Sequence, residues 1–368
     1  MYCCENCFKD DFLIEVVESY DEIGKCDYCN SEQVFIVDMN ELSQYFGIVK
    51  KLYKPLMIGE NITPDDNILH AGEKLFDLFN DSWEVFYGFD PDAEEELFYD
   101  LMNSLDSTED YQQLYAKGQD DYYHRDSVDL WNSLSQKLTK QNRFFPGRQG
   151  QHGQEEIDNI IDITKSVFYQ QEFKIKKGYK LLRARIGEFY NLDELSSPPE
   201  NIISVGRANP VGIRMLYCVS NEEDKEIALE TAIAEVRAPA SSTVTVADIR
   251  TNKDLTFVNL SDFERIESVF ELNQYADPIA ELDRNQLTSH YVSSLSKPIL
   301  EDTAQIEYIS TQYLTALAEH LNFDGIMFRS SIAKGINFVI FDEQNCDFWK
   351  LNRYKIEGLK YSIRELKL

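Results

Sequence analysis

The chain contains no run of about 18 consecutive apolar residues, so the sequence predicts no membrane-spanning helix. Its first residues, MYCCENC, include neither a basic nor an apolar segment, and we therefore expect no secretory signal. Histidine is scarce, with five residues in 368, of which only His290 and His320 lie in the second half. No Ser–His–Asp arrangement is evident in that half, which also lacks the His/Asp cluster that a metal-dependent hydrolase needs. Internal repeats and long low-complexity tracts are also absent from the sequence.

Basic residues are in the minority, with 36 Lys and Arg against 65 Asp and Glu and a net charge of −29. A field of this sign repels polyanions, which argues against broad binding to a nucleic-acid backbone but allows a local basic pocket for one small anionic ligand. The hydrophobic share of 43% and the aromatic share of 12% fit a folded globular protein long enough for two domains. Seven cysteines without a secretory signal indicate a reducing compartment, so we expect a cytoplasmic protein.

Two Cys-x-x-Cys pairs, separated by 18 intervening residues, occur near the start of the chain, and they consist of Cys4, Cys7, Cys26 and Cys29. This spacing is typical of a zinc ribbon, in which each pair supplies two thiolates to one tetrahedral ion. A site closed by four cysteines is structural and not catalytic, and Cys3 is left over as a spare. The alternative is that the thiols are free. We predict a zinc-ribbon domain at residues 1–38.

Residues 39–150 are predicted to form a helical domain. Apolar residues recur there at three- and four-residue spacing, in the segments 73–86, 94–105, 111–118 and 127–138. The segment 144–156, FFPGRQGQHGQEE, is rich in glycine and glutamine and loses this period after its first residues. It is therefore the expected boundary between the helical domain and the rest of the chain.

Residues 151–368 are predicted to form an α+β domain with a mixed sheet. After a helix near 157–173, short segments rich in β-branched or aromatic residues occur at 179–186, 242–249, 255–260 and 336–341. Loops and helical patterns separate these segments, and Asp302 with Gln305 resembles a capping box at the start of one helix. This order favours a mixed sheet over a doubly wound one.

The stretch GRANPVGIRMLYCV, residues 206–219, combines features that favour a binding site. Glycine and proline bend its loop, which presents the cation of Arg207, and the strand that follows carries Tyr217 in its interior. A helix comes next, for which Asn221 is the expected N-cap. Glu235 shares a face of that helix with apolar residues, so we expect its carboxylate on the side that is buried. A solvated or salt-bridged acid is the alternative reading of Glu235.

The second half of the chain resembles the RES domain, a family named for an arginine, a glutamate and a serine. The matching segments read KLLRARIG with Arg183, GRANPVGIRMLY, TAIAEV with Glu235, and FDGIMFRSS with Ser330, followed by GINFVIF. They occur in the order of the family over roughly residues 178–345. The ordered set is much more specific than any single piece.

The resemblance implies an ADP-ribosyltransferase-like core and a reaction with NAD+. RES proteins cleave NAD+ at the nicotinamide–ribose bond with water or phosphate as the acceptor, and some transfer ADP-ribose to a macromolecule. The implied NAD+-binding residues are Arg183, Arg207, Asn209 and Tyr217, and the implied catalytic residues are Arg183, Glu235, Ser330 and Tyr217. The arginines would hold the pyrophosphate, and Glu235 would stabilise the ribosyl cation as nicotinamide leaves. Arg185 and Ser331 stay open as chemical equivalents of Arg183 and Ser330.

The helical region in front resembles the HEPN-like module that precedes some RES domains. HEPN ribonucleases carry an arginine a short distance before a histidine, but His124 has no such arginine, so a scaffold or interaction role is favoured over a nuclease. The leading hypothesis is an NAD+-cleaving toxin of the cytoplasm that is controlled by an antitoxin or a regulatory protein. The alternatives are an ADP-ribosyltransferase that modifies protein or nucleic acid, and a non-enzymatic zinc-ribbon and helical adaptor.

Overall fold

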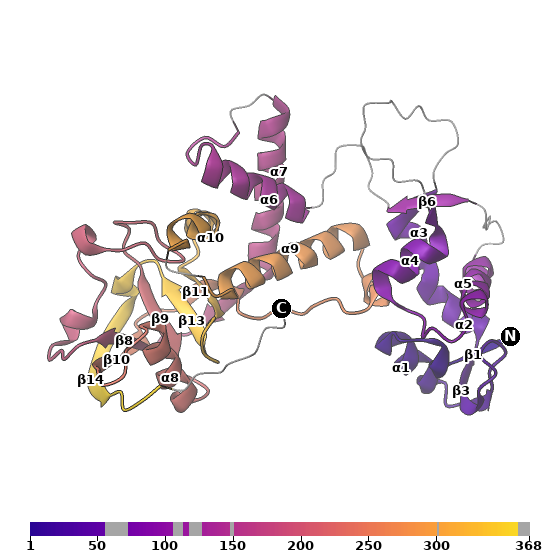
Figure 1. The fold of residues 1–368 in the computed structure, drawn as a ribbon, viewed down its shortest axis with the longest axis horizontal. Coiled ribbons are helices and arrows are strands. Elements are labelled where there is room, and N and C mark those ends of the chain that lie inside the picture. Colours follow the sequence, from indigo (N-terminus) through magenta and orange to yellow (C-terminus); the bar gives the residue numbers. More distant parts are fainter. Residues whose placement is uncertain (56–72, 106–112, 118–126, 148–150, 300–301, 360–368) are drawn as a thin grey trace, which may run out of the picture. The chain divides into compact units, whose positions relative to one another are not determined.

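The structure is a computed structural model, and it describes the chain except for residues 56–72, 106–112, 118–126, 148–150, 300–301 and 360–368. The chain divides into two compact units (Figure 1). Unit 1 consists of Met1–Arg125 and Arg265–Asn285, and unit 2 consists of Asp126–Glu264 and Gln286–Leu368. None of the described helices is long and apolar enough to cross a membrane.

Unit 1 combines short helices with two small antiparallel sheets. The first sheet has the order β1-β3-β2, with strands β1 (Tyr2–Cys4), β2 (Ile23–Lys25) and β3 (Glu32–Asp38). The second has the order β4-β6-β5, with strands β4 (Tyr53–Pro55), β5 (Glu73–Lys74) and β6 (Leu114–Lys117). The longer helices are α1 (Asp11–Ser19), α2 (Met39–Ser43), α3 (Gly47–Leu52), α4 (Leu75–Trp83) and α5 (Pro91–Leu105).

The expectation of a helical turn in the segment 111–118 is wrong for its described residues, which form strand β6. Tyr115 pairs with Pro55 of β4 on one side and with Glu73 of β5 on the other. A short apolar run does not distinguish a strand from a helical turn, so pairing with two neighbours decides the conformation.

The core of unit 1 includes residues from a later part of the chain, within Arg265–Asn285. The short 3-10 helix Val269–Gln274 buries Phe270, which is 1% exposed, against Phe46, with the two ring centroids 4.9 Å apart. The side-chain amide of Asn273 donates a hydrogen bond to the carbonyl oxygen of Tyr45 at 2.7 Å. This segment lies inside the range that the sequence assigned to the second domain, yet it completes the core of the first unit.

We expect Phe270→Ala to lower the free energy of unfolding of unit 1 by about 3–5 kcal/mol, because it leaves a cavity among packed rings. Urea unfolding of the full chain measures the change. Phe144→Ala is the control, since that ring is 81% exposed and its removal opens no cavity. Equal effects of the two substitutions would contradict the placement of Phe270 in the core.

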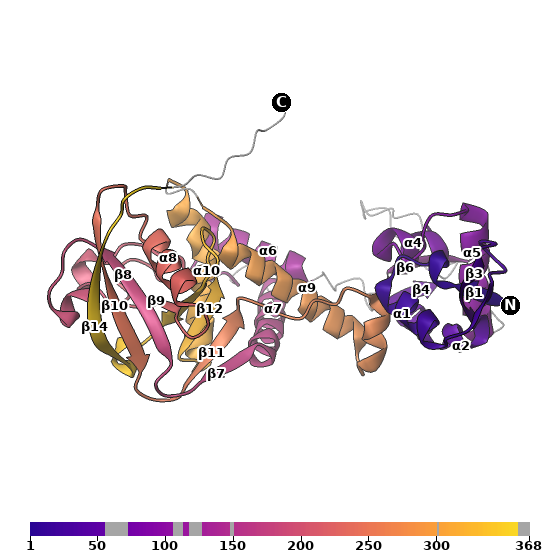
Figure 2. The same cartoon turned by 90° about the horizontal axis from the view of Figure 1, so that it is seen from below.

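Unit 2 is built on a sheet that has eight strands in the described part of the chain. Its order is β14-β10-β8-β9-β13-β12-β11-β7 (Figure 2). The strands are β7 (Glu172–Ile175), β8 (Lys180–Ile186), β9 (Leu216–Ser220), β10 (Thr243–Thr251), β11 (Leu255–Leu260), β12 (Gly325–Arg329), β13 (Ile336–Ile340) and β14 (Cys346–Lys355). β11 and β12 pair in parallel, whereas the other neighbours pair antiparallel. The predicted α+β class with a mixed sheet is confirmed.

The helices of unit 2 pack on this sheet and on one another. They are α6 (Ser127–Lys140), α7 (Gln151–Gln170), α8 (Lys225–Glu235), α10 (Ala304–His320) and the later part of α9 (Pro278–Ser296). α8 lies against β8 and β9, where Ala228 and Ala232 pack with Leu182 and Val219. On α6, the ring of Trp131 lies 5.0 Å from that of Tyr291 on α9. The boundary expected at residues 144–156 therefore lies inside unit 2.

Two helix caps differ from the prediction. At α8 the side chain of Asp224, and not that of Asn221, accepts hydrogen bonds from two backbone N–H groups of the first turn, at 2.8 and 3.0 Å. At α10 Thr303 occupies the N-cap position, and its side chain makes no capping bond. Several consecutive polar residues precede each helix, and the sequence alone does not select the one that caps.

Candidate functional site

The carboxylate of Glu235 is held at the end of α8 by two side chains from the sheet. Its Oε1 accepts hydrogen bonds from the Ser330 hydroxyl at 2.7 Å and from Nδ2 of Asn337 at 2.6 Å. Ser330 directly follows β12, and Asn337 lies on β13. No hydrogen bond joins Oε2 to any described residue, and the side chain is exposed. One carboxylate oxygen is thus fixed and the other is available to a ligand.

The Ser330 hydroxyl is oriented by the turn in which it lies. Its oxygen accepts from the backbone N–H groups of Ala333 at 3.1 Å and Ile332 at 3.3 Å, which leaves its hydrogen for Glu235. The backbone N–H of Ser330 donates to the carbonyl oxygen of Gly335 at 3.0 Å and closes the turn. The structure therefore brings together Glu235 and Ser330, two of the predicted catalytic residues.

Helix α8 approaches this turn closely at Thr231, one helical turn before Glu235. The hydroxyl of Thr231 accepts from the backbone N–H of Gly335 at 3.0 Å and donates to the carbonyl oxygen of Ile227 at 2.7 Å. A Cβ atom at Gly335 would lie 2.6 Å from the Thr231 oxygen. Glycine is required here because any side chain would displace the helix that carries Glu235.

The GRANP loop, residues 206–210, is braced by Tyr217 of β9. The Tyr217 hydroxyl donates to Oδ1 of Asn209 at 2.7 Å and accepts from the backbone N–H of Ala208 at 3.0 Å. A Cβ at Gly206 would lie 2.6 Å from this hydroxyl oxygen, so the loop again depends on a glycine. Burial raises the pKa of Tyr217, so the phenol stays protonated and keeps its donor role.

Asn209 has all of its amide groups engaged within the same loop. Its Nδ2 donates to the carbonyl oxygens of Ser204 at 3.2 Å and Pro210 at 3.0 Å, and its side chain is buried. Tyr217 and Asn209, both predicted to bind NAD+, are therefore neighbours that hold the loop in shape.

The guanidinium of Arg207 lies at the C-terminal end of α9. NH1 donates to the carbonyl oxygen of Ser294 at 3.2 Å, NH2 donates to that of Lys297 at 2.9 Å, and the group lies 5.3 Å from the centre of the Tyr308 ring. Burial lowers the pKa of Arg207, while Tyr308 and Glu235 act in the opposite direction. Of the two arginines predicted to bind NAD+, Arg207 is therefore the one that interacts electrostatically with Glu235.

The structure does not bring Arg183 to Glu235. On β8, Leu182 packs against α8, and Arg183, the next residue, points to the other face of the sheet. Its Nε donates to the carbonyl oxygen of Leu195 at 2.7 Å, and its NH1 donates to that of Tyr217 at 2.8 Å. Burial lowers the pKa of Arg183.

The two equivalents that the sequence left open, Arg185 and Ser331, differ in their contacts from Arg183 and Ser330. Arg185 donates to the carbonyl oxygen of Glu194, and its guanidinium lies 5.7 Å from the centre of the Phe189 ring. Ser331 follows Ser330 in the turn, but it is the Ser330 hydroxyl that donates to Glu235.

Residues 180–362 match the family model of the RES domain. The chain contains a RES domain. A comparison with solved structures finds the crystal structure of the M. tuberculosis MbcT–MbcA toxin–antitoxin complex, at 13% sequence identity and a TM-score of 0.31, with 52% of this chain and 92% of that chain covered. No curated protein matches the chain.

Asn337 is a residue of the candidate site that could not be named from the sequence motifs. It lies in the segment GINFVIF, between Ile336 and Phe338, and is 6% exposed. A buried amide in an otherwise apolar strand needs hydrogen-bond partners. That requirement is the signal that could have singled Asn337 out, although its partner Glu235 could not be named from it.

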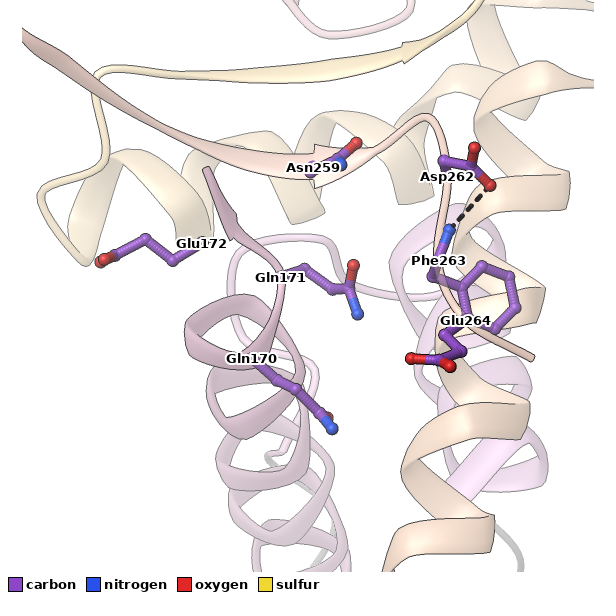
Figure 3. A pocket seen from close by; sticks show the side chains of 7 residues that line it. All are labelled: Gln170, Gln171, Glu172, Asn259, Asp262, Phe263 and Glu264. Carbon is purple, nitrogen blue, oxygen red and sulfur yellow. Dashed lines mark hydrogen bonds between the residues drawn. The ribbon is translucent and has the colours of Figure 1, made fainter. Parts of the chain in front are cut away.

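A hollow of about 490 Å³ lies elsewhere in unit 2, where the end of α7 and the start of β7 meet the segment after β11 (Figure 3). It is lined by Gln170, Gln171, Glu172, Asn259, Asp262, Phe263 and Glu264. Three of these side chains are carboxylates, and two of them are ion-paired, Glu172 with Lys174 at 2.6 Å and Asp262 with Arg329 at 2.9 Å. The lining itself contains no cation that could bind the pyrophosphate of NAD+. The hollow is therefore a poor fit for the anionic ligand that the RES resemblance implies.

The four predicted zinc ligands meet in unit 1. Their Sγ atoms lie within 4.8 Å of one another, with distances of 3.8 Å for Cys4–Cys7, 3.4 Å for Cys4–Cys29 and 3.5 Å for Cys7–Cys26. Four sulfurs at about 2.3 Å from one zinc ion would lie roughly 3.8 Å apart. The backbone N–H groups of Tyr28 and Cys29 also point at Sγ of Cys26, at 3.4 and 3.5 Å. The donor set fits zinc.

Cys3 lies outside this cluster, and its thiol approaches the carbonyl oxygen of Val37 at 3.9 Å instead. The interpretation of Cys3 as a spare agrees with this placement.

Cys26→Ser is expected to lose about one equivalent of zinc per chain, because three thiolates do not close a structural site. Metal analysis of the purified full-length protein measures the loss. Cys3→Ser is the matched control and should keep its zinc, since Cys3 is a neighbour of the cluster and not a member. Equal zinc content in the two variants would remove the zinc ribbon from the description of unit 1.

Proposed function

We propose that the RES domain cleaves NAD+ at the bond between nicotinamide and ribose. The observation that carries the proposal is the carboxylate of Glu235, which Ser330 and Asn337 hold through Oε1 while Oε2 stays available. Such a carboxylate can accept a hydrogen bond from a ribose hydroxyl and stabilise the positive charge that develops on the ribose. The substrate itself is inferred from the family resemblance.

The reaction needs little more from the protein than orientation and charge. The bond between the anomeric carbon and the pyridinium nitrogen breaks, and its electron pair leaves with neutral nicotinamide. An acceptor oxygen then attacks the anomeric carbon, and a water acceptor releases a proton. Because Ser330 and Asn337 already hold the Glu235 carboxylate, it does not have to reorganise while the cation forms.

Arg207 is our candidate for binding the pyrophosphate. Its planar guanidinium suits phosphate oxygens. In the described part of the chain, NH1 and NH2 each donate one hydrogen bond to a carbonyl oxygen, so each has a second N–H group for a ligand. For Arg183 we propose a supporting role, since its two hydrogen bonds link the carbonyl oxygen of Leu195, in the 3-10 helix Leu192–Leu195, to that of Tyr217 on β9. Arg183 would then affect NAD+ through Tyr217 and not through direct contact.

We further propose that the protein is a toxin under the control of an antitoxin or another regulatory protein. An enzyme that consumes NAD+ harms the cell that makes it, so its activity has to be restrained. Unit 1 has its own core and its own metal-binding residues, which supports a role in binding such a partner. Transfer of ADP-ribose to a macromolecule is the alternative use of the same site.

Product analysis tests the proposed reaction. The purified protein is incubated with NAD+ in the presence and absence of phosphate, and nicotinamide, ADP-ribose and its phosphate ester are measured. We expect nicotinamide in at least one condition, and the second product identifies the acceptor as water or phosphate. Nicotinamide release with ADP-ribose attached to protein or nucleic acid indicates a transferase. Absence of nicotinamide under all conditions, with a candidate macromolecular acceptor present, would refute the proposal in favour of the adaptor.

Glu235→Gln should reduce kcat by roughly 10²–10³ with little change in KM, because the lost charge matters more in the transition state than in bound NAD+. The substitution keeps the shape and the hydrogen-bonding capacity of the side chain, so stability should change little. Glu230→Gln is the matched control, since Glu230 is exposed on the same helix. A folded Glu235→Gln protein with near-normal kcat would contradict the catalytic role of Glu235.

A further inference from the structure

Helix α10 contacts the GRANP loop through three residues on one of its faces. The ring of Tyr308 lies under the guanidinium of Arg207, with 5.3 Å between the guanidinium carbon and the ring centre. The Thr311 hydroxyl donates to the carbonyl oxygen of Arg207 at 2.7 Å. Positions 308, 311 and 312 have the spacing i, i+3 and i+4, so the three side chains lie together on the helix surface.

The third contact, made by Gln312, reaches both ends of the loop. Its Nε2 donates to the carbonyl oxygen of Gly206 at 2.9 Å and to that of Asn209 at 3.0 Å. The carbonyl oxygen of Asn209 also accepts from the backbone N–H of Gly206 at 2.9 Å, which makes the loop a closed turn. One side-chain amide therefore spans the turn whose apex carries Arg207.

We infer that Gln312 is a positioning residue for Arg207, and through it for the anionic part of the substrate. The two N–H groups of one amide fix the carbonyl groups on either side of Arg207, so the backbone that carries the guanidinium has little freedom to rotate. Tyr308 and the carbonyl oxygens of Ser294 and Lys297 hold the far end of the same side chain. The inference rests on the proposed function only for the identity of the ligand.

Glutamine is suited to this place because both loop groups are acceptors. A glutamate of the same size would present only acceptors to the two carbonyl oxygens, and a leucine would present no polar group at all. Both substitutions therefore remove the bridge while leaving the side-chain volume nearly the same. They differ in charge, so an effect that is common to both reports on the lost bridge.

The test compares Gln312→Leu and Gln312→Glu with Gln305→Leu in the full-length protein. Gln305 is exposed in the first turn of α10, so its replacement removes the same amide from the same helix without touching the loop. In the absence of NAD+, amide hydrogen exchange at residues 204–212 should be faster in both Gln312 variants and unchanged in the control. Exchange that stays at the wild-type rate in both Gln312 variants would overturn the inference.

With NAD+ as substrate, each Gln312 variant should raise KM by about tenfold, the effect of one misplaced binding group, with a smaller change in kcat. In an Arg207→Ala background the same substitutions should leave KM unchanged, because Gln312 acts through Arg207. A merely structural Gln312 would change KM equally in both backgrounds, and that result would also overturn the inference.

Failure of the two ideas can be told apart. If the wild-type protein does not cleave NAD+, the proposed function fails, but the hydrogen-exchange comparison still decides whether Gln312 holds the loop. If the wild-type protein cleaves NAD+ and neither Gln312 variant changes KM, the proposed function stands and the positioning role is wrong.

Discussion

The contact between Thr231 and Gly335 sets the distance between helix α8 and the turn that follows β12. Both hydrogen bonds to the Glu235 carboxylate depend on that distance, because Ser330 opens the turn and Asn337 lies just after it. A side chain at position 335 would push the helix outward and lengthen both bonds together. The geometry of the candidate site thus depends on the absence of a Cβ atom at Gly335. Because the helix is rigid, a displacement at Thr231 would also move Glu235.

The two arginines predicted to hold the pyrophosphate have backbone carbonyl oxygens as partners, whereas Arg214 and Arg329 of the same domain pair with the carboxylates of Glu343 and Asp262. Arg183 donates to two of them and Arg207 to two others, although the chain carries 65 acidic residues that could have paired with them. A carbonyl oxygen orients a guanidinium without cancelling its charge, whereas a carboxylate would neutralise it. In a protein with a net charge of −29, this arrangement preserves a local positive field at the loop where an anionic ligand is expected.

Much of the fold and part of the site could be predicted from the sequence, because the signals were local. The spacing of the four cysteines predicts that their thiols lie together, as they do. Segments such as 255–260 are rich in β-branched and aromatic residues, which predicts a strand. The opposite orientation of Arg183 and Glu235 could not be predicted, because it depends on which face of the sheet α8 covers. Asn337 was missed for a similar reason, since its importance comes from a partner about a hundred residues earlier.

The packing of residues 265–285 into unit 1 has a consequence for the order in which the protein can be completed during synthesis. Domains usually fold in the order in which they leave the ribosome, the N-terminal one first. Here the first unit lacks Phe270 and its neighbours until β7 to β11 have already been made. The N-terminal unit must therefore wait, with part of its apolar core uncovered, while most of the RES-domain sheet is translated. The two units are therefore completed at nearly the same stage of synthesis. A chain that ends before residue 265 contains all the residues of neither unit.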